Sequence, residues 1–367
     1  MQIREIGEQG LLKILQGFCP SEIVGDDGAV LPWIYCRDGN REATNGQHQN
    51  DRQSLVVTTD VLIEGVHFSD RTTSPSDAGW RSVAANLSDL AAMGAEPVGI
   101  TVGLGLRGET EVSWLEGLYQ GMAECLQQTP IVGGDVVRSP TNTIAITAFG
   151  RVDPQRVIRR SSAQVGDAIV ITGSHGKSKA GLELLLYPEK YQQGSETEAT
   201  SFSEDYREMI RAHQRPQPRL DVLPYLAALA DLADLADLNT LAEESHIGAE
   251  LDYHVAGMDS SDGLVDAVCQ ICRASGVGAR IDRSALSIPE AITRMVSNKT
   301  ALDWVLYGGE DFELVLCLPY VAAQSLVQSL GTGAAIIGTI TAEPAILLLS
   351  EKDETLNLTQ EKGFQHF

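Results

Sequence analysis

The chain has 367 residues, of which 27 are Lys or Arg and 50 are Asp or Glu, so its formal net charge at pH 7 is −23. Hydrophobic residues make up 43% and charged residues 21%, which is typical of a globular protein and too apolar for a disordered one. At roughly 100–200 residues per domain, this length predicts two domains. Such an acidic chain is repelled by nucleic acids and anionic membrane surfaces, so we expect neither as a partner.

The sequence also indicates where the protein resides. No segment approaches the ~20 consecutive apolar residues of a membrane-spanning helix. Residues 1–18 mix charged side chains with Ile and Leu, which predicts an amphipathic helix rather than a signal peptide. The six cysteines are scattered over a large chain, which favours reduced thiols in a cytoplasmic protein over a disulfide framework.

Strand-like and helix-like patterns alternate in the first half of the chain. Residues 55–61 are rich in β-branched side chains and predict a strand. Residues 77–94 predict a helix, with Pro75 and Ser76 as start signals and Gly94 as the stop. Two further strands are expected at 98–106 and 142–152, with a helix over 111–127 between them.

The pattern restarts after Pro154, so we place a domain boundary there and predict domains at 1–152 and 153–367. In the second domain, strands are predicted at 168–172 and 313–318, and another begins at 279–281; one helix begins at 181–186 and another spans 261–274.

Three stretches have the composition of insertions: 37–53, 192–204 and 226–256. The first two are polar and predict solvated loops. The third contains ALADLADLADL, in which Leu recurs every three residues and therefore does not form one clean helical stripe. We interpret it as a surface helical extension that carries no chemistry.

The most informative residues are carboxylates set among Gly, Ser and Thr, mostly at the ends of apolar runs. They occur at Gly25-Asp26-Asp27-Gly28, Thr58-Thr59-Asp60, Ser88-Asp89, Gly133-Gly134-Asp135, Asp259-Ser260-Ser261-Asp262-Gly263 and Gly308-Gly309-Glu310-Asp311. Mg²⁺ prefers oxygen ligands and often bridges to substrate phosphates. Carboxylates gathered in one place repel one another unless cations neutralise them. The pattern therefore suggests Mg²⁺ together with a polyphosphate.

Each acidic motif also has a purely structural interpretation. Asp26-Asp27-Gly28 and Gly134-Asp135 are compatible with turns, and Asp259–Asp262 with capping of the helix that follows. Asp89 lies with Ser82 and Asn86 opposite an apolar stripe, which is equally typical of a solvent-exposed helix face. No single motif decides between the two interpretations.

Three weaker signals stand outside the acidic motifs. Gly173–Ser178 superficially suggests a P-loop, but the Walker spacing fails, so we interpret it as a glycine turn with room for a phosphate nearby. Cys269-x-x-Cys272 has no second pair at zinc-finger spacing and is interpreted as helix packing. His67, next to Phe68, is taken from its surroundings alone as a structural residue.

Taken together, the motifs match a known family. Beyond the six acidic motifs, the matching residues are Gly65-Val66-His67-Phe68, the run from Ala85 to Ala95, and Arg160-Ser161 with Gly166-Asp167. In order and spacing they closely resemble the thiamine-monophosphate kinase family, which belongs to the aminoimidazole-ribonucleotide synthetase superfamily. The resemblance covers nearly the whole chain except the three insertions.

The resemblance implies an α+β fold of two domains. It implies an N-terminal α/β domain that dimerises through its sheet, a C-terminal α/β domain, and ATP with several Mg²⁺ ions in the cleft between them. The implied reaction is transfer of the γ-phosphate of ATP to thiamine monophosphate, the last step of thiamine diphosphate biosynthesis. We expect direct in-line transfer, because the sequence offers no obvious nucleophile–base pair.

Residue roles carry over from the family position by position. The implied Mg²⁺ ligands are Asp27, Thr58, Thr59, Asp60, Asp89, Asp135, Asp259 and Asp262. Of these, the residues implied to act in catalysis are Asp60, Asp89, Asp135 and Asp262. The implied ATP contacts are Gly134, Asp135, Arg160 and Ser261. The implied substrate contacts are His67, Glu310 and Phe364, which replaces the structural interpretation of His67.

Two alternatives remain open at this stage. One is another ATP-dependent enzyme of the superfamily, with aminoimidazole-ribonucleotide synthetase the nearest and the C-terminal aromatic tail arguing against it. A selenophosphate synthetase would need a reactive residue in a setting that Cys19 lacks, and the hydrogenase-maturation relative ends in Cys where this chain ends in Phe367. The other alternative is a non-catalytic dimer that binds a magnesium nucleotide.

Overall fold

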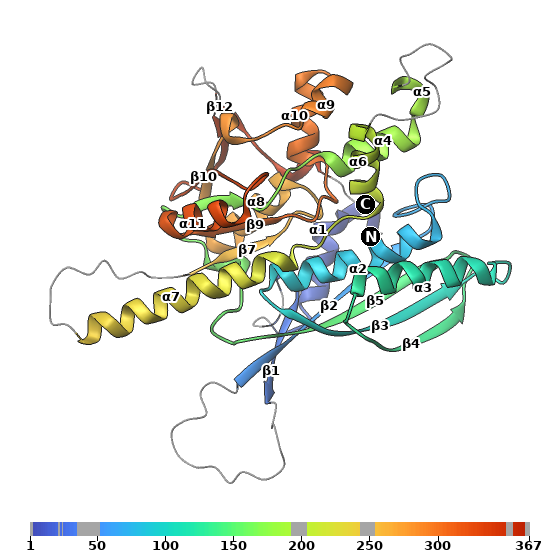
Figure 1. Ribbon diagram of the computed structural model, residues 1–367, viewed down its shortest axis with the longest axis horizontal. Helices are drawn as coiled ribbons and strands as arrows, with labels where there is room; N and C mark the ends of the chain where they lie inside the picture. Colours follow the sequence, from blue (N-terminus) through green and yellow to red (C-terminus); the bar gives the residue numbers. More distant parts are fainter. Residues whose placement is uncertain are drawn as a thin grey trace, which may run out of the picture.

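The computed structural model describes residues 3–20, 23, 25–34, 52–191, 204–242, 254–349 and 355–363. Most of the predicted insertions at 37–53 and 192–204, part of the insertion at 226–256, and Phe364 lie outside these residues. The described chain forms two β-sheets, each with its own helices, as the α+β prediction requires (Figure 1).

The first sheet has five strands in the order β1-β2-β5-β3-β4. Their bounds are β1 (Ala29–Ile34), β2 (Arg52–Ile63), β3 (Glu96–Leu106), β4 (Ile131–Arg138) and β5 (Thr143–Val152). Neighbouring strands are antiparallel except β3 and β4, which are parallel. The predicted domain boundary falls where β5 ends.

Strand β4 replaces the turn that Gly134-Asp135 suggested. Both residues lie inside the strand, and Gly134 pairs with Val102 of β3. A Cβ atom at Gly134 would lie 2.2 Å from the carbonyl oxygen of Val102, so the close approach of the strands requires glycine there. Every residue of β4 is exposed, which makes it an uncovered edge of the sheet.

Helices α2 (Pro75–Ala92) and α3 (Val112–Leu126) cover one face of this sheet (Figure 1). The Ser74 side chain caps α2 by accepting a hydrogen bond from the Asp77 amide. The interpretation of Ser82 and Asn86 as a solvent face was wrong, because both are 0% exposed. Helix α2 is buried on this side too, since the second domain packs against it.

The second sheet has seven strands in the order β12-β11-β8-β10-β6-β9-β7. Their bounds are β6 (Ala168–Ile171), β7 (Ala256–Asp259), β8 (Gly278–Asp282), β9 (Leu314–Leu318), β10 (Ala335–Thr341), β11 (Ile346–Leu349) and β12 (Thr355–Asn357). The strands β6, β7 and β9 are buried throughout. Their apolar side chains are divided between two clusters of buried residues, and the larger one also contains those of α8 (Leu264–Ser275).

Of the remaining described helices, α1 (Ile3–Gln16) precedes the first sheet in the chain, and the others lie in the second domain. These others are α4 (Lys177–Leu186), α5 (Pro188–Tyr191), α6 (Glu204–Gln214), α7 (Leu223–Ala242), α8 (Leu264–Ser275), α9 (Glu290–Met295), α10 (Asn298–Tyr307) and α11 (Tyr320–Leu330). The N-terminal helix and the helical extension were predicted, and α7 projects away from the body of the molecule (Figure 1). None of the described helices is both long and apolar enough to cross a membrane.

Candidate active site

Three carboxylates meet where the two domains touch. Asp27 precedes β1, Asp89 lies near the end of α2, and Asp259 ends β7. One oxygen from each lies within 4.8 Å of the others. We call Asp27, Asp89 and Asp259 the acidic cluster.

Strand β2 supplies two further predicted residues beside the acidic cluster. Thr58 is 8% exposed, and its hydroxyl donates a hydrogen bond to the Asp89 carboxylate. Asp60 is two residues further along, so it lies on the same face of the strand as Thr58, the face that α2 covers. The negative charge of Asp60 is among the causes that raise the pKa of Asp89.

Burial and mutual repulsion shift the acidic cluster strongly toward its protonated form. Burial is the largest cause for each carboxyl, and it raises the pKa of Asp27 to about 7 and that of Asp60 to about 6. The pKa of Asp89 is well above its usual value, because burial is reinforced by the charges of Asp60, Asp259 and Asp27. The pKa of Asp259 is also raised. A cation bound among these groups would remove the repulsion.

The donor chemistry of the cluster fits a hard divalent cation. Its ligand atoms are carboxylate oxygens, the type that Mg²⁺ prefers. Asp27 Oδ2 is buried and has no hydrogen-bond partner, so a lone pair is available there for a ligand. These residues could therefore hold Mg²⁺.

Arg160 brings a positive charge to the cluster from the second domain. Its Nη2 donates a 2.7 Å hydrogen bond to Asp27 Oδ1, and its backbone amide donates to Asp26 Oδ1 at 2.9 Å. A guanidinium remains charged at any working pH and suits the geometry of phosphate oxygens. The predicted ATP contact is thus adjacent to the predicted metal ligands.

Serine hydroxyls from both domains orient Asp259. The predicted ATP contact Ser261 donates to Asp259 Oδ1 at 3.0 Å, and Ser88 donates to Oδ2 at 2.6 Å. Ser88 was not among the predicted site residues, although it stands next to Asp89 in the same motif. Because Ser88 is on α2, its hydrogen bond joins the two domains at the cluster.

Gly134 and Asp135 of β4 lie apart from the acidic cluster within this chain. Along the register of the sheet, Asp60 and Gly134 are separated by three strand spacings, or about 14 Å. Thr59 faces the opposite side of β2 from Thr58, and its hydroxyl donates to the Ile146 carbonyl at 2.8 Å. Asp262 is exposed in the turn that follows β7. The structure thus gathers only part of the predicted ligand set.

The predicted substrate residues come from both domains. Glu310 precedes β9, and its carboxylate accepts a hydrogen bond from the buried Arg81 of α2. His67 follows β2, where its Nδ1 accepts a 3.0 Å hydrogen bond from the Ile63 amide. The described part of the C-terminal tail ends at Gly363, where an added Cβ would lie 3.6 Å from the Asp262 carbonyl oxygen.

The glycine turn at 173–178 already has an anion at its amides. The Asp311 carboxylate accepts hydrogen bonds from the backbone amides of Gly176, at 2.7 Å, and Ser178, at 2.9 Å. These are the amides at the start of α4, where a phosphate would bind. The chain's own carboxylate thus occupies that position.

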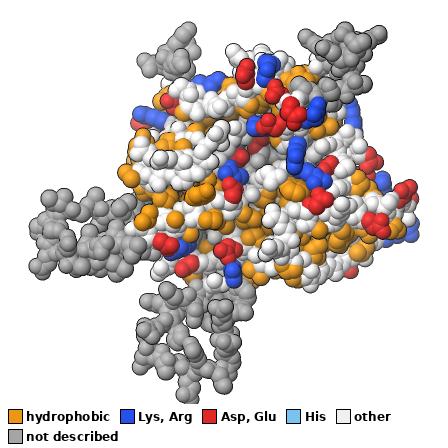
Figure 2. Space-filling model, viewed as in Figure 1, with side chains coloured by type: hydrophobic (Ala, Val, Ile, Leu, Met, Phe, Trp, Pro, Cys, Tyr) orange, Lys and Arg blue, Asp and Glu red, His pale blue; other side chains and the backbone are white. Residues whose placement is uncertain are grey.

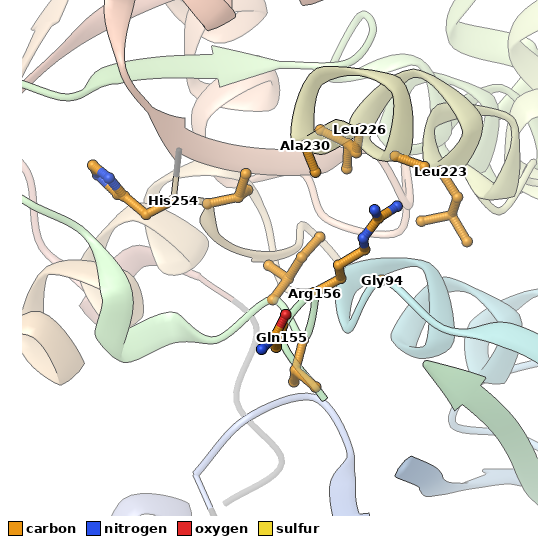
Figure 3. Close-up of a pocket in the computed structure, with 11 residues that line it drawn as sticks. Gly94, Gln155, Arg156, Leu223, Leu226, Ala230 and His254 are labelled. Atoms are coloured by element: carbon orange, nitrogen blue, oxygen red, sulfur yellow. The ribbon is translucent and has the colours of Figure 1, made fainter. Parts of the chain in front are cut away.

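The pocket in Figure 3 is separate from the acidic cluster. It has a volume of about 100 Å³ and lies between α7 and the segment that joins the domains. Its lining contains no Asp or Glu, and its labelled polar side chains are Gln155, Arg156 and His254. This lining offers no carboxylates for magnesium.

Comparisons with known proteins identify the family. The AIR synthase related protein N-terminal domain matches residues 25–152, and the corresponding C-terminal domain matches residues 254–348. A thiamine-monophosphate kinase from Synechococcus elongatus is 48% identical, over 100% of this chain and 98% of the relative. The chain belongs to the thiamine-monophosphate kinase family. The thiamine-monophosphate kinase from Escherichia coli K12 is 34% identical over 86% of this chain and 88% of its own length.

Solved structures agree with this family. The structure described as AaThiL complexed with AMPPCP and TMP has a TM-score of 0.75 and 26% sequence identity, covering 100% of this chain and 99% of that one. The hydrogenase maturation protein HypE has a TM-score of 0.60 at 20% identity and supports the fold alone. The predicted two-domain α+β architecture of the superfamily is confirmed.

Proposed function

We propose that this protein transfers the γ-phosphate of ATP to thiamine monophosphate, forming thiamine diphosphate and ADP. The observation that carries the proposal is the acidic cluster beside Arg160, in a chain 48% identical over its full length to a thiamine-monophosphate kinase. The related structure with AMPPCP, an analogue of ATP, and TMP supports the same pair of substrates.

We further propose that several Mg²⁺ ions bind at the cluster, with Asp27, Asp89 and Asp259 as ligands and Thr58 and Asp60 beside them. Donor and acceptor are both anions, and metal ions supply the charge neutralisation that allows them to approach. The remaining work of the chain is positioning. Ser88 and Ser261 fix the Asp259 carboxylate, and Arg160 places a fixed positive charge next to Asp27.

The transfer is proposed to be direct. One histidine–serine pair lies near the cluster, with His175 Nε2 at 3.0 Å from Ser260 Oγ. Both residues are 1% exposed, and burial lowers the pKa of His175 to about 4. A pair sealed in this way cannot reach ATP, so a phosphate oxygen of the acceptor is the better nucleophile. Detection of a phosphorylated side chain during turnover would contradict direct transfer.

We also propose a homodimer formed through the uncovered face and edge of the first sheet. Apolar side chains lie exposed there, at Val61, Ile63, Val132 and Val136. Covering such a surface is favourable because apolar area leaves water. Light scattering should give the mass of a dimer, and Val61→Asp should shift it toward the monomer; a wild-type monomer would contradict the proposal.

We propose a cytoplasmic location as well. The described cysteines are all free, which supports it.

One assay tests the proposed reaction. Purified protein is incubated with magnesium, ATP and thiamine monophosphate, and thiamine diphosphate is measured directly. Absence of product would remove the kinase proposal. Consumption of ATP only with formylglycinamidine ribonucleotide would favour the synthetase alternative, and nucleotide binding without any turnover would favour the non-catalytic dimer.

A further inference from the structure

A buried polar layer joins the domains at a second place along α2. Arg81 is 3% exposed, and its guanidinium donates to the His213 carbonyl oxygen through Nη1 and to Glu310 Oε1 through Nη2. The Glu310 side chain is 37% exposed. One partner of this ion pair is therefore sealed inside the protein while the other reaches solvent.

The backbone places Glu310 next to the turn that follows β7, in which Ser261 lies. Its amide donates a 2.7 Å hydrogen bond to the Ser261 carbonyl oxygen, and its φ of 56° is in the left-handed region that non-glycine residues rarely adopt. Gly309 before it also has a positive φ of 67°. Such a conformation persists only where surrounding contacts fix it, so the position of Glu310 is tightly specified.

Neutral His213 leaves Arg81 as the cation of this layer. Burial, reinforced by the charges of Arg81 and Lys179, holds the pKa of His213 well below its usual value. Its Nδ1 lies 3.2 Å from Ser178 Oγ and 3.7 Å from Glu310 Oε2. Within the part of the chain that the structure describes, the permanently charged partner of Glu310 is Arg81.

Helix α2 sets the distance between this layer and the acidic cluster. Arg81 and Asp89 are eight residues apart, which corresponds to about 12 Å along one rigid helix and about 80° around its axis. Helix α2 thus carries both Asp89, a proposed metal ligand, and Arg81, which binds Glu310.

We infer that Arg81 is a positioning residue for the phosphate acceptor: it fixes the Glu310 carboxylate where thiamine monophosphate is proposed to contact it. This inference rests on the proposed function and on the predicted contact of Glu310 with that substrate. Arg81 holds one oxygen of Glu310 by a charge-assisted hydrogen bond. The fixed carboxylate then needs no reorganisation when the acceptor binds.

The test compares Arg81 with Arg219, a partly buried arginine with similar partners. Arg219 donates to the Thr172 carbonyl oxygen and to the Glu313 carboxylate, and it also pairs with Asp221. Arg81→Met and Arg219→Met each remove an arginine–carboxylate interaction, but only the first involves Glu310. KM for each substrate, kcat and melting temperature are measured for both, with the wild type in the same assay to report on the proposed function itself.

We expect Arg81→Met to raise KM for thiamine monophosphate about 10-fold or more, with KM for ATP changed less than about 2-fold. Arg219→Met should lower the melting temperature without changing either KM. Arg81→Lys retains the charge, so its KM for thiamine monophosphate should lie between those of Arg81→Met and the wild type. It replaces Arg81→Met in the test if that variant does not fold.

Glu310→Gln and its combination with Arg81→Met then complete a double-mutant cycle. If Arg81 acts through Glu310, the double variant has the KM of Glu310→Gln alone. The inference is overturned if folded Arg81 variants bind the acceptor normally, if Glu310→Gln leaves its KM unchanged, or if the two effects add. None of these results would affect the proposed reaction, which the wild-type assay decides.

Discussion

The acidic cluster and the Arg81 layer, which consists of Arg81, Glu310 and His213, are two polar regions along helix α2. Their charges are balanced in opposite ways. In the cluster, three carboxylates share a site with one nearby guanidinium, that of Arg160. In the Arg81 layer, one guanidinium meets one carboxylate and a neutral imidazole. We therefore expect the first region to need cations from solution, whereas the charges of the second are matched within the chain.

Buried charges therefore have different roles in the two regions: they attract metal ions in one and fix the geometry of side chains in the other. An unmatched buried charge is costly until a partner arrives, so a surplus of carboxylates favours binding of metal. A matched pair gains little from an added ion but restricts the geometry of both partners. We thus expect variants of the cluster to change metal dependence and variants of the Arg81 layer to change recognition of the acceptor.

The largest expected effect comes from Asp60→Asn, which removes a negative charge beside the cluster. Turnover should fall by roughly 10³-fold or more, because the Mg²⁺ ions that are proposed to neutralise the phosphates would lose a carboxylate that attracts them. Ionised Asp60, with its pKa raised to about 6, costs the ligand-free fold on the order of 2–3 kcal/mol at neutral pH. The melting temperature without ligands should therefore be unchanged or higher. Near-wild-type activity would contradict a role in metal binding.

Glu96→Gln is the control for this variant. Glu96 forms an exposed ion pair with Arg151 on the first sheet, far along the strands from Asp60. Turnover should be unchanged, and unfolding free energy should change by less than about 1 kcal/mol.

An intermediate effect is expected from Thr58→Val, which keeps the shape of the side chain but removes the hydroxyl that donates to Asp89. The Mg²⁺ concentration that gives half-maximal activity should rise about 10- to 100-fold, as for other residues that orient metal ligands. Thr147→Val provides the control, since its hydroxyl lies 3.1 Å from Thr59 on the other face of the sheet. Equal Mg²⁺ dependence in both variants would show that the Thr58 hydroxyl does not orient Asp89.

The smallest effect is a dependence of stability on pH and Mg²⁺. The pKa values of Asp27 and Asp60 rise from 3.8 to about 7 and about 6 on folding, so between about pH 4 and pH 7 the folded chain binds more protons than the unfolded chain. The contribution of these groups to stability therefore falls as the pH rises through this window. Mg²⁺ should raise the melting temperature by several degrees more at pH 8 than at pH 5. An equal shift at both pH values would contradict metal binding by these carboxylates.

Periodicity predicted the elements that carry the site, but it could not reveal what packs against them. The strand at 55–61 and the helix at 77–94 correspond to β2 and α2, because their patterns are strong and local. Ser82 and Asn86 were misplaced because nothing within α2 indicates that a second domain covers its polar face. The motifs predicted that Asp27, Asp89 and Asp259 share a site, and the structure brings them together.

Strand β4 shows the opposite failure. Gly133-Gly134-Asp135 has the local composition of a turn, and pairing with β3, a contact distant in sequence, makes it a strand. The same pairing separates Gly134 and Asp135 from the acidic cluster, which spacing along the chain could not show. The predicted roles of these residues, and of Phe364, remain predictions.

Helix α2 also determines where this protein tolerates changes in length. Inserting one residue between Arg81 and Asp89 would turn one end of the helix by about 100° and move it by about 1.5 Å relative to the other. Arg81 could then not meet Glu310 while Asp89 faces Asp27 and Asp259. The three predicted insertions all lie outside this segment. Tolerance to insertion and deletion should therefore fall sharply within these two turns of helix.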